Sequence, residues 1–453
     1  MVRNLLAVFA LIFSLAAAAG ADDRLTVHEW GTFTSLEDES GAPIGGINTD
    51  DEPLPPFVHD LHGIIDGPSE LPRQIFSKGL PFNSLDPDVR VRLETPVIYF
   101  HLPANGPKSI KLDVDVTFHG GWLTQYYPDA EVSAPGLDAG RIGKLNGTTD
   151  GTLAWHGLTI GTAGAGPETK APVWLAPRTV AAAGVTTAKN ESERFLFYRG
   201  VGNISPPVGV SRSTDGATLE IRGQSPESLR SLWLVDVTSD GRCALRSLSG
   251  AVKTGADHLL TSATFASADY AVESLAAIRT SLKRAMVQEG LFADEADALL
   301  NTWETSYFRR PGLRLFFLVP TAWTDRMLPL RLSVGADVKR VMIGRIEIVT
   351  PQDRALLATI AKGPASNPGT WLYAALKQAG GGRDDYYKQE SYLKVITGQT
   401  SLQSLNIDMP VDYRAYLQLG RFRHAMLLDE SLRHPTSALS QFLRNYGLNV
   451  GVQ

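Results

Sequence analysis

The sequence is poor in several features that would point to a class of function. Its 453 residues include a single cysteine, Cys243, so no intramolecular disulfide can form. The 43 basic and 48 acidic residues leave a formal net charge of −5, which argues against a basic nucleic-acid-binding protein. With 43% hydrophobic and 20% charged residues, the composition is that of an ordinary globular protein and not of a disordered or collagen-like chain.

The chain also lacks the short motifs that mark several common enzyme classes. It contains no GxSxG elbow, no GxxxxGK[ST] phosphate loop, no GxGxxG and no HExxH. Ser391-x-x-Lys394, Ser404-Leu405-Asn406 and Lys253-Thr254-Gly255 match the three elements of penicillin-recognising enzymes, but they occur in the wrong order. The sequence therefore names no reaction and no cofactor, and it leaves open whether the protein is an enzyme.

The first 21 residues have the organisation of a secretory signal peptide. Arg3 precedes an apolar stretch from Leu5 to Ala18, and three small residues end the segment at Ala21. We therefore expect cleavage after Ala21 and a periplasmic or extracellular location. No later run of about 18 apolar residues exists, so we expect no integral membrane insertion after cleavage.

The first half of the chain has the pattern of β-structure. Between Ile110 and Phe118, apolar residues alternate with polar ones, which predicts a strand with one buried and one wet face. Other strands are expected at residues 24–36, 89–102, 152–160, 194–198, 217–222, 229–237 and 242–248. Many short strands separated by turns favour a β-sandwich-like region over residues 22–267.

The pattern changes near residue 268. Apolar residues at steps of three and four between Val272 and Met286 predict a helix, and a second helix is expected from Asp294. Together with strands at 313–319 and 341–349, they predict an α/β region over residues 268–351 that packs on the sandwich. Residues 352–453 are expected to be helical, with helices at 352–362, 370–378, 413–433 and 436–446. The predicted fold class is α+β.

The most distinctive string is His28-Glu29-Trp30-Gly31-Thr32-Phe33-Thr34-Ser35. Further matching strings lie at residues 94–100, 197–200, 290–330 and 344–347. On these strings the chain resembles a poorly characterised family of secreted bacterial proteins that share an N-terminal HEWGTFT motif. The resemblance implies export and relatedness over most of the chain, and it implies no activity.

Histidines are the candidate metal ligands. If residues 24–36 form a strand, His28 and Trp30 share one face and Glu29 lies on the other, so one metal ion could not easily take both His28 and Glu29. His28, His101 and His119 together would make a chemically suitable site for a divalent metal such as zinc. No local spacing motif supports that set, however, and hydrogen-bonded structural histidines are the alternative.

Other polar and aromatic residues are candidates for catalysis or binding. Glu94 lies in an apolar strand, where an isolated buried carboxylate would be costly, and Arg92 offers it an ion pair. Glu304 follows Trp303 in the second helix, as a cleft carboxylate or as a surface charge. The candidate catalytic residues are His28, Glu29, Glu94 and Glu304. The candidate ligand-binding residues are Trp30, Tyr99, Tyr198, Arg199 and Trp303.

The sequence leaves two functions open, and the absence of any recognised catalytic spacing favours the first of them. In the first, the protein is an envelope or secreted module that binds a small molecule, a glycan or an envelope protein. The aromatic residues Trp122, Tyr126, Tyr127 and Trp155 invite sugar stacking, although core packing is the commoner use of such residues. In the second, the protein is hydrolase-like, with the four candidate catalytic residues converging on one pocket for acid–base or metal-assisted chemistry.

Overall fold

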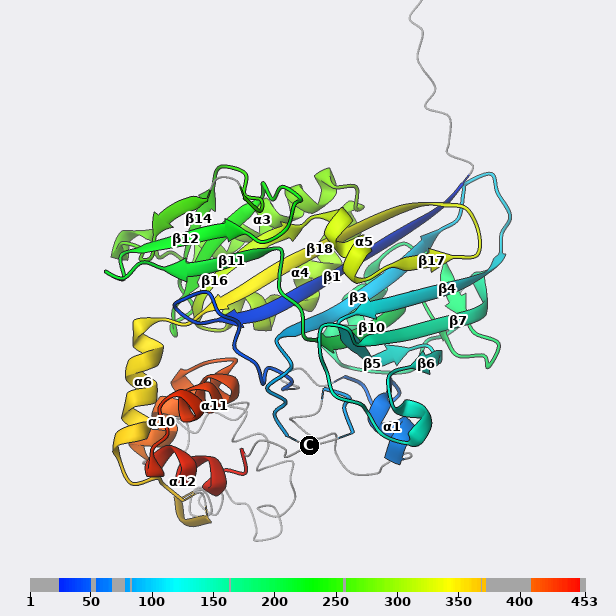
Figure 1. Cartoon of the computed structure of the whole chain (residues 1–453). Coiled ribbons are helices and arrows are strands. Elements are labelled where there is room, and N and C mark those ends of the chain that lie inside the picture. The colour runs from blue at the N-terminus through cyan, green and yellow to red at the C-terminus, as the bar shows by residue number, and fades with distance from the viewer. Residues whose placement is uncertain are drawn as a thin grey trace, which may run out of the picture.

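One large mixed β-sheet forms the body of the protein, with helices and a second small sheet packed on it (Figure 1). The computed structural model describes residues 24–49, 54–66, 78–81, 84–162, 164–255, 258–367, 369–371 and 409–448. The predicted signal peptide and most of the helix predicted at 370–378 lie outside these residues. The α+β class predicted from the sequence is confirmed.

The main path of the large sheet runs in the order β14-β13-β16-β18-β1-β3-β10-β5-β7-β4-β17. Its strands are β1 Leu25–Glu37, β3 Val91–His101, β4 Ile110–His119, β5 Gly121–Tyr127, β7 Asp150–Gly161, β10 Leu196–Gly202, β13 Leu232–Val237, β14 Cys243–Leu248, β16 Gly312–Val319, β17 Leu330–Leu332 and β18 Ala336–Ile348. Four short strands pair off this path: β2 His59–Asp60, β6 Glu131–Ser133, β8 Gly184–Thr186 and β9 Ser192–Glu193.

The first strand lies in the middle of this sheet. β1 pairs in parallel with β18 over its whole length and antiparallel with β3 on its other side. Residues of β1 belong to the cores on both faces of the sheet, so both faces of this central strand are buried. Strands from residues 22–267 and strands from residues 268–351 therefore pair within one sheet.

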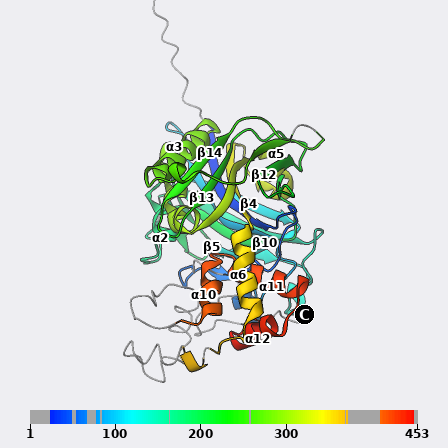
Figure 2. The ribbon, with the colours of Figure 1, turned by 90° about the vertical axis from the view of Figure 1, so that its left-hand side faces the viewer.

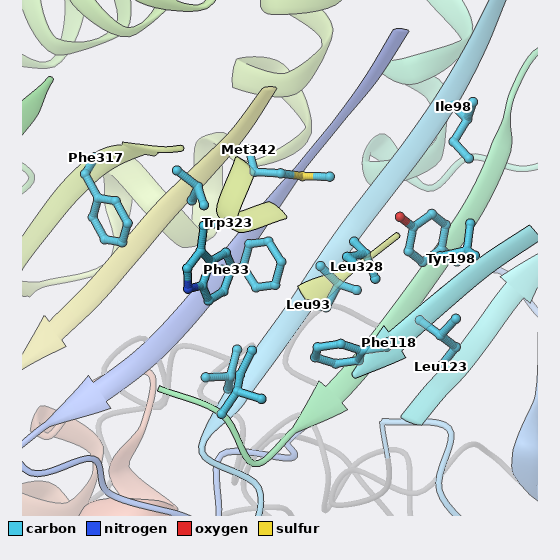
Figure 3. Close-up of a cluster of buried hydrophobic side chains, with 14 of the residues drawn as sticks. Phe33, Leu93, Ile98, Phe118, Leu123, Tyr198, Phe317, Trp323, Leu328 and Met342 are labelled. Atoms are coloured by element: carbon cyan, nitrogen blue, oxygen red, sulfur yellow. The ribbon is translucent and has the colours of Figure 1, made fainter. Parts of the chain in front are cut away.

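One face of the sheet carries a large, mainly apolar core. Phe33 of β1, Leu93 of β3 and Met342 of β18 pack there against Trp323, which lies on the short helix α5 (Thr321–Met327) (Figure 3). The three-stranded sheet β11 (Val208–Arg212), β12 (Thr218–Gly223) and β15 (Leu259–Ser262) contributes to the same core. This region is thus a sheet-on-sheet packing over part of the large sheet.

Helices cover the opposite face. α3 (Glu273–Gln288) and α4 (Ala293–Thr302) pack over a core that includes Trp30 and Tyr99. The short helix α2 (Pro172–Leu175) packs beside α4, and a π-helical segment, Glu304–Arg309, follows α4. The helices predicted from Val272 and from Asp294 are confirmed within one or two residues at their starts.

The C-terminal helices form a separate layer below the sheet (Figure 2). They are α6 (Pro351–Lys362), α10 (Val411–Gln418), α11 (Arg423–Arg433) and α12 (Ser437–Asn445). Thr350 caps α6 by accepting the backbone N–H of Asp353. The single helix predicted over 413–433 is wrong, because Gly420 adopts φ = 77° and the chain turns there between α10 and α11.

The remaining short helix is α1 (Leu61–Asp66), which follows β2. In the part of the chain that the structure describes, no helix is long and apolar enough to cross a membrane.

Candidate functional site

Two histidines meet on the helix-covered face of the sheet. In the β1–β3 register, His28 lies opposite Tyr99 and Thr26 lies opposite His101, so the two histidines are diagonal neighbours on one face. Their ring centroids are 5.2 Å apart. The strand pattern predicted that His28 shares a face with Trp30, and the antiparallel register of β1 and β3 brings His101 to that same face.

Helix α4 brings a carboxylate to both imidazoles. The Nδ1 atom of His28 lies 2.7 Å from Oε2 of Glu295, and the Nε2 atom of His101 lies 2.8 Å from Oε1. Glu295 is at the third position of α4, where its Oε2 also accepts the backbone N–H of Phe292 at 2.7 Å. The capping interaction therefore fixes the carboxylate above the two histidines.

The electrostatics of Glu295 keep it ionised. Burial alone would raise the pKa of this carboxyl group, but the hydrogen bonds from His101 and His28 outweigh burial and lower its pKa. Glu295 is fully buried, and His28 is nearly so. His101 keeps 14% of its side chain exposed, so it is the most exposed of the three residues.

The same three residues form a donor set suited to a metal ion. One nitrogen from each histidine and one carboxylate oxygen lie within 4.8 Å of one another. Two imidazoles and one carboxylate are ligands of zinc in catalytic sites and of non-haem iron(II).

The structure does not place His119, the third histidine of the predicted site, in this group. His119 ends β4 and pairs with Asp150 at 2.9 Å, with 45% of its side chain exposed. Four strands separate β4 from β1 in the sheet. Glu295 takes the third position, and sequence reasoning missed it because a glutamate in the first turn of a helix is commonly a capping residue.

Glu29 lies on the opposite face of β1 from His28, as the strand pattern predicts. It accepts hydrogen bonds from the Tyr198 hydroxyl and from Nε of Arg340. Burial and the adjacent charge of Glu29 raise the pKa of Tyr198 far above its usual range. Glu29 is therefore held in a buried ion pair away from the histidines.

Glu94 belongs to a second buried polar cluster. Its Oε1 lies 2.6 Å from Nη2 of Arg92 and 2.7 Å from Nη2 of Arg421, which comes from the C-terminal layer. Its Oε2 accepts hydrogen bonds from Thr34 and Tyr307, each at 3.2 Å. Thr34 is six residues after His28 on β1, which corresponds to about 20 Å along a strand.

Glu304, the fourth candidate catalytic residue, lies partly exposed in the π-helical segment. It pairs with Arg309, and its other oxygen lies 3.6 Å from Arg279. His28, Glu29, Glu94 and Glu304 thus belong to four separate sets of contacts. The geometry gathers His28, His101 and Glu295 instead.

The candidate ligand-binding residues are all in the interior. Trp30 and Tyr99 are buried on the same face of the sheet as His28, with their ring centroids 6.2 Å apart, and the Tyr99 hydroxyl donates to the carbonyl of Pro177. Arg199 lies 5.9 Å from the Trp303 ring, on the same side of the sheet as the helices. The aromatic residues considered for sugar stacking, Trp122, Tyr126, Tyr127 and Trp155, are also buried.

Comparisons with known proteins add little to this geometry. No protein-family model matches the chain, and no curated protein matches it. One solved structure to which the chain is similar is the yeast delta-COP-I mu-homology domain complexed with a Dsl1 WxWxV peptide. The identity is 7% and the TM-score 0.23, over 72% of this chain and 96% of the yeast chain, and so weak a likeness carries no argument.

Proposed function

We propose that this protein is an exported metal-binding module whose ligand is a divalent first-row transition ion, held by His28, His101 and Glu295. The observation that carries the proposal is the convergence of these three donors, which are 73 and 194 residues apart along the chain, within 4.8 Å. Zinc is the occupant that the donor set suits most directly, because zinc takes neutral imidazole and carboxylate ligands together.

Three features support a metal site over a purely structural hydrogen-bond network. The ligands come from three separate elements, β1, β3 and α4, which the sheet register and the helix cap hold in place. The carboxylate is buried and faces two imidazoles, which are titratable metal ligands. In addition, two buried aromatic residues flank His28 on the same face of the sheet, Trp30 two residues along β1 and Tyr99 opposite it on β3, and they give the site an apolar surround that would limit access of water.

Metal-assisted hydrolysis is the second candidate function. Three protein ligands leave at least one coordination position for water, which is the arrangement of catalytic zinc sites, and His101 is partly exposed. This version of the hydrolase differs from an acid–base pocket of His28, Glu29, Glu94 and Glu304, because three of those residues lie in other contact sets.

Metal analysis tests the proposal. We would purify the mature protein without chelator and measure bound metals by mass spectrometry, then repeat the measurement for His28→Ala, His101→Ala and Glu295→Gln. About one ion per chain is expected in the wild type and a loss of stoichiometric metal in each variant. His119→Ala is the matched control and should keep its metal.

The outcome that would overturn the proposal is a wild-type protein that takes up no zinc, cobalt or iron(II) even when these are added. Thermal unfolding of each variant checks that it is folded, so that loss of metal is not mistaken for loss of structure. If metal is bound, assays with chromogenic ester and phosphate-ester substrates, with and without chelator, decide between binding and hydrolysis.

A further inference from the structure

An aromatic side chain lies directly over the two histidines. The ring centroid of Phe292 is 4.6 Å from that of His28 and 4.8 Å from that of His101. Phe292 is 47% exposed, although it is a large apolar residue. One side of the ring therefore contacts the candidate ligands while the rest faces solvent.

The turn that carries Phe292 is held on both sides. The N–H of Phe292 donates to the Glu295 carboxylate, which ties the turn to helix α4. The preceding residue, Leu291, is buried, and its N–H donates to the carbonyl of Met286 at the end of α3. Gly290 begins the turn at φ = 111°, and a side chain there would meet the aliphatic stem of Lys339 at 3.2 Å. The ring is thus presented by a fixed turn.

The solvent side is the side from which an exogenous ligand would approach the metal. Glu295 and His28 are closed off by the sheet and by α4, and only His101 keeps a small exposed fraction. Because the Phe292 ring contacts both imidazoles, it narrows the space next to any ion that they bind.

We propose that Phe292 is the specificity-determining residue of this site: its ring admits small ligands such as water, hydroxide or azide to the bound ion and excludes bulky ones. The inference rests on the proposed metal-binding function. Selection arises from the fixed position of an apolar ring, so it acts on ligand size and needs no contact with the metal. We therefore expect the bound ion to accept small anions at its open coordination position.

The test uses the cobalt(II)-loaded protein, whose visible absorption reports changes in coordination. Azide and benzoate are titrated into the wild type, Phe292→Ala and Phe292→Leu, with Val287→Ala, another half-exposed apolar residue, as the matched control. We expect Phe292→Ala to bind benzoate at least about tenfold more tightly, the range that pocket-size changes produce, with azide affinity changed less than about threefold. Phe292→Leu should fall between, and Val287→Ala should match the wild type.

Two results would overturn this inference. One is an unchanged ratio of azide to benzoate affinity in a Phe292→Ala protein that still binds cobalt. The other is a cobalt-loaded wild type that binds neither anion, because the site would then have no open position. A wild type that takes up no cobalt at all is a different failure, and it removes the proposed function itself.

Discussion

Two buried glutamates on the helix side of the sheet have opposite kinds of partners. Glu295 faces two histidines, His28 and His101, whereas Glu94 faces the guanidinium groups of Arg92 and Arg421 and, at 3.6 Å, the ammonium group of Lys78. Arginine stays protonated in proteins and cannot ligate a metal, but a neutral imidazole can. A buried carboxylate is therefore a candidate metal ligand only when the side chains around it, such as imidazoles, can lose a proton and bind the metal as well.

The largest loss of stability is expected when Glu94, the carboxylate bound by arginines, is removed. Glu94→Ala would leave buried cations next to an apolar side chain, and breaking a buried ion pair in this way costs about 3–5 kcal/mol. We therefore expect the free energy of unfolding to fall by about that amount in denaturant titrations, and added zinc should not restore it. A loss below about 1 kcal/mol would show that Glu94 is not a structural anchor.

The histidine-bound carboxylate should behave differently. For a site that binds only the folded state, zinc at 100 times its dissociation constant adds about 2.7 kcal/mol to the free energy of unfolding. Glu295→Gln should remove this zinc-dependent gain, while thermal unfolding without metal should change less than in Glu94→Ala. If zinc stabilises the wild type and Glu295→Gln equally, Glu295 does not bind the metal, and its contrast with Glu94 is wrong.

A third buried carboxyl group, that of Glu37 at the end of β1, differs from both glutamates because it should make the stability of the protein depend on pH. It accepts the backbone N–H of Val210 at 2.7 Å, and burial, with a smaller contribution from the charge of Asp38, raises its pKa to about 8. The folded protein then holds a proton that the unfolded chain loses above about pH 4.5. Stability should therefore fall as pH rises toward 8, by about 2 kcal/mol between pH 6 and pH 8 from this group alone.

The variant Glu37→Gln tests whether Glu37 causes this fall in stability between pH 6 and pH 8. The amide oxygen can still accept the Val210 N–H, but the side chain no longer titrates, so unfolding measured at pH 6, 7 and 8 should show a flatter dependence. An unchanged pH dependence would mean that Glu37 is ionised in the folded protein.

The smallest effect is expected at Glu304. Its ion pairs with Arg309 and Arg279 are partly exposed, and such pairs contribute at most about 1 kcal/mol. Glu304→Ala should change the unfolding midpoint only slightly and leave metal content unchanged. Loss of bound metal in this variant would place Glu304 in the site and contradict the assignment.

Local patterns in the sequence were enough to predict much of the fold. The alternation of residues 110–118 and the apolar spacing between Val272 and Met286 predicted β4 and α3, because each element buries one face. The parallel pairing of β1 with β18 was not predictable in the same way. It joins segments about 300 residues apart and depends on packing that no local pattern records.

The candidate site was predictable only in part for the same reason. Strand parity placed His28 beside Trp30 and away from Glu29, and His101 was among the candidate ligands. Glu295 was missed because its role depends on how α4 docks on the sheet, and His119 was chosen because chemistry alone cannot tell one strand histidine from another. Only the spatial proximity of distant segments shows that Glu295 lies next to His28 and His101.

The most direct test of the proposed metal site uses crystals of the zinc-loaded protein. Diffraction data recorded on both sides of the zinc absorption edge give an anomalous-difference map that locates zinc. We expect one strong peak within coordination distance of His28 Nδ1, His101 Nε2 and a carboxylate oxygen of Glu295, with the Phe292 ring beside it. A peak at other residues, or an intact His28–Glu295–His101 hydrogen-bond network with no peak, would contradict it.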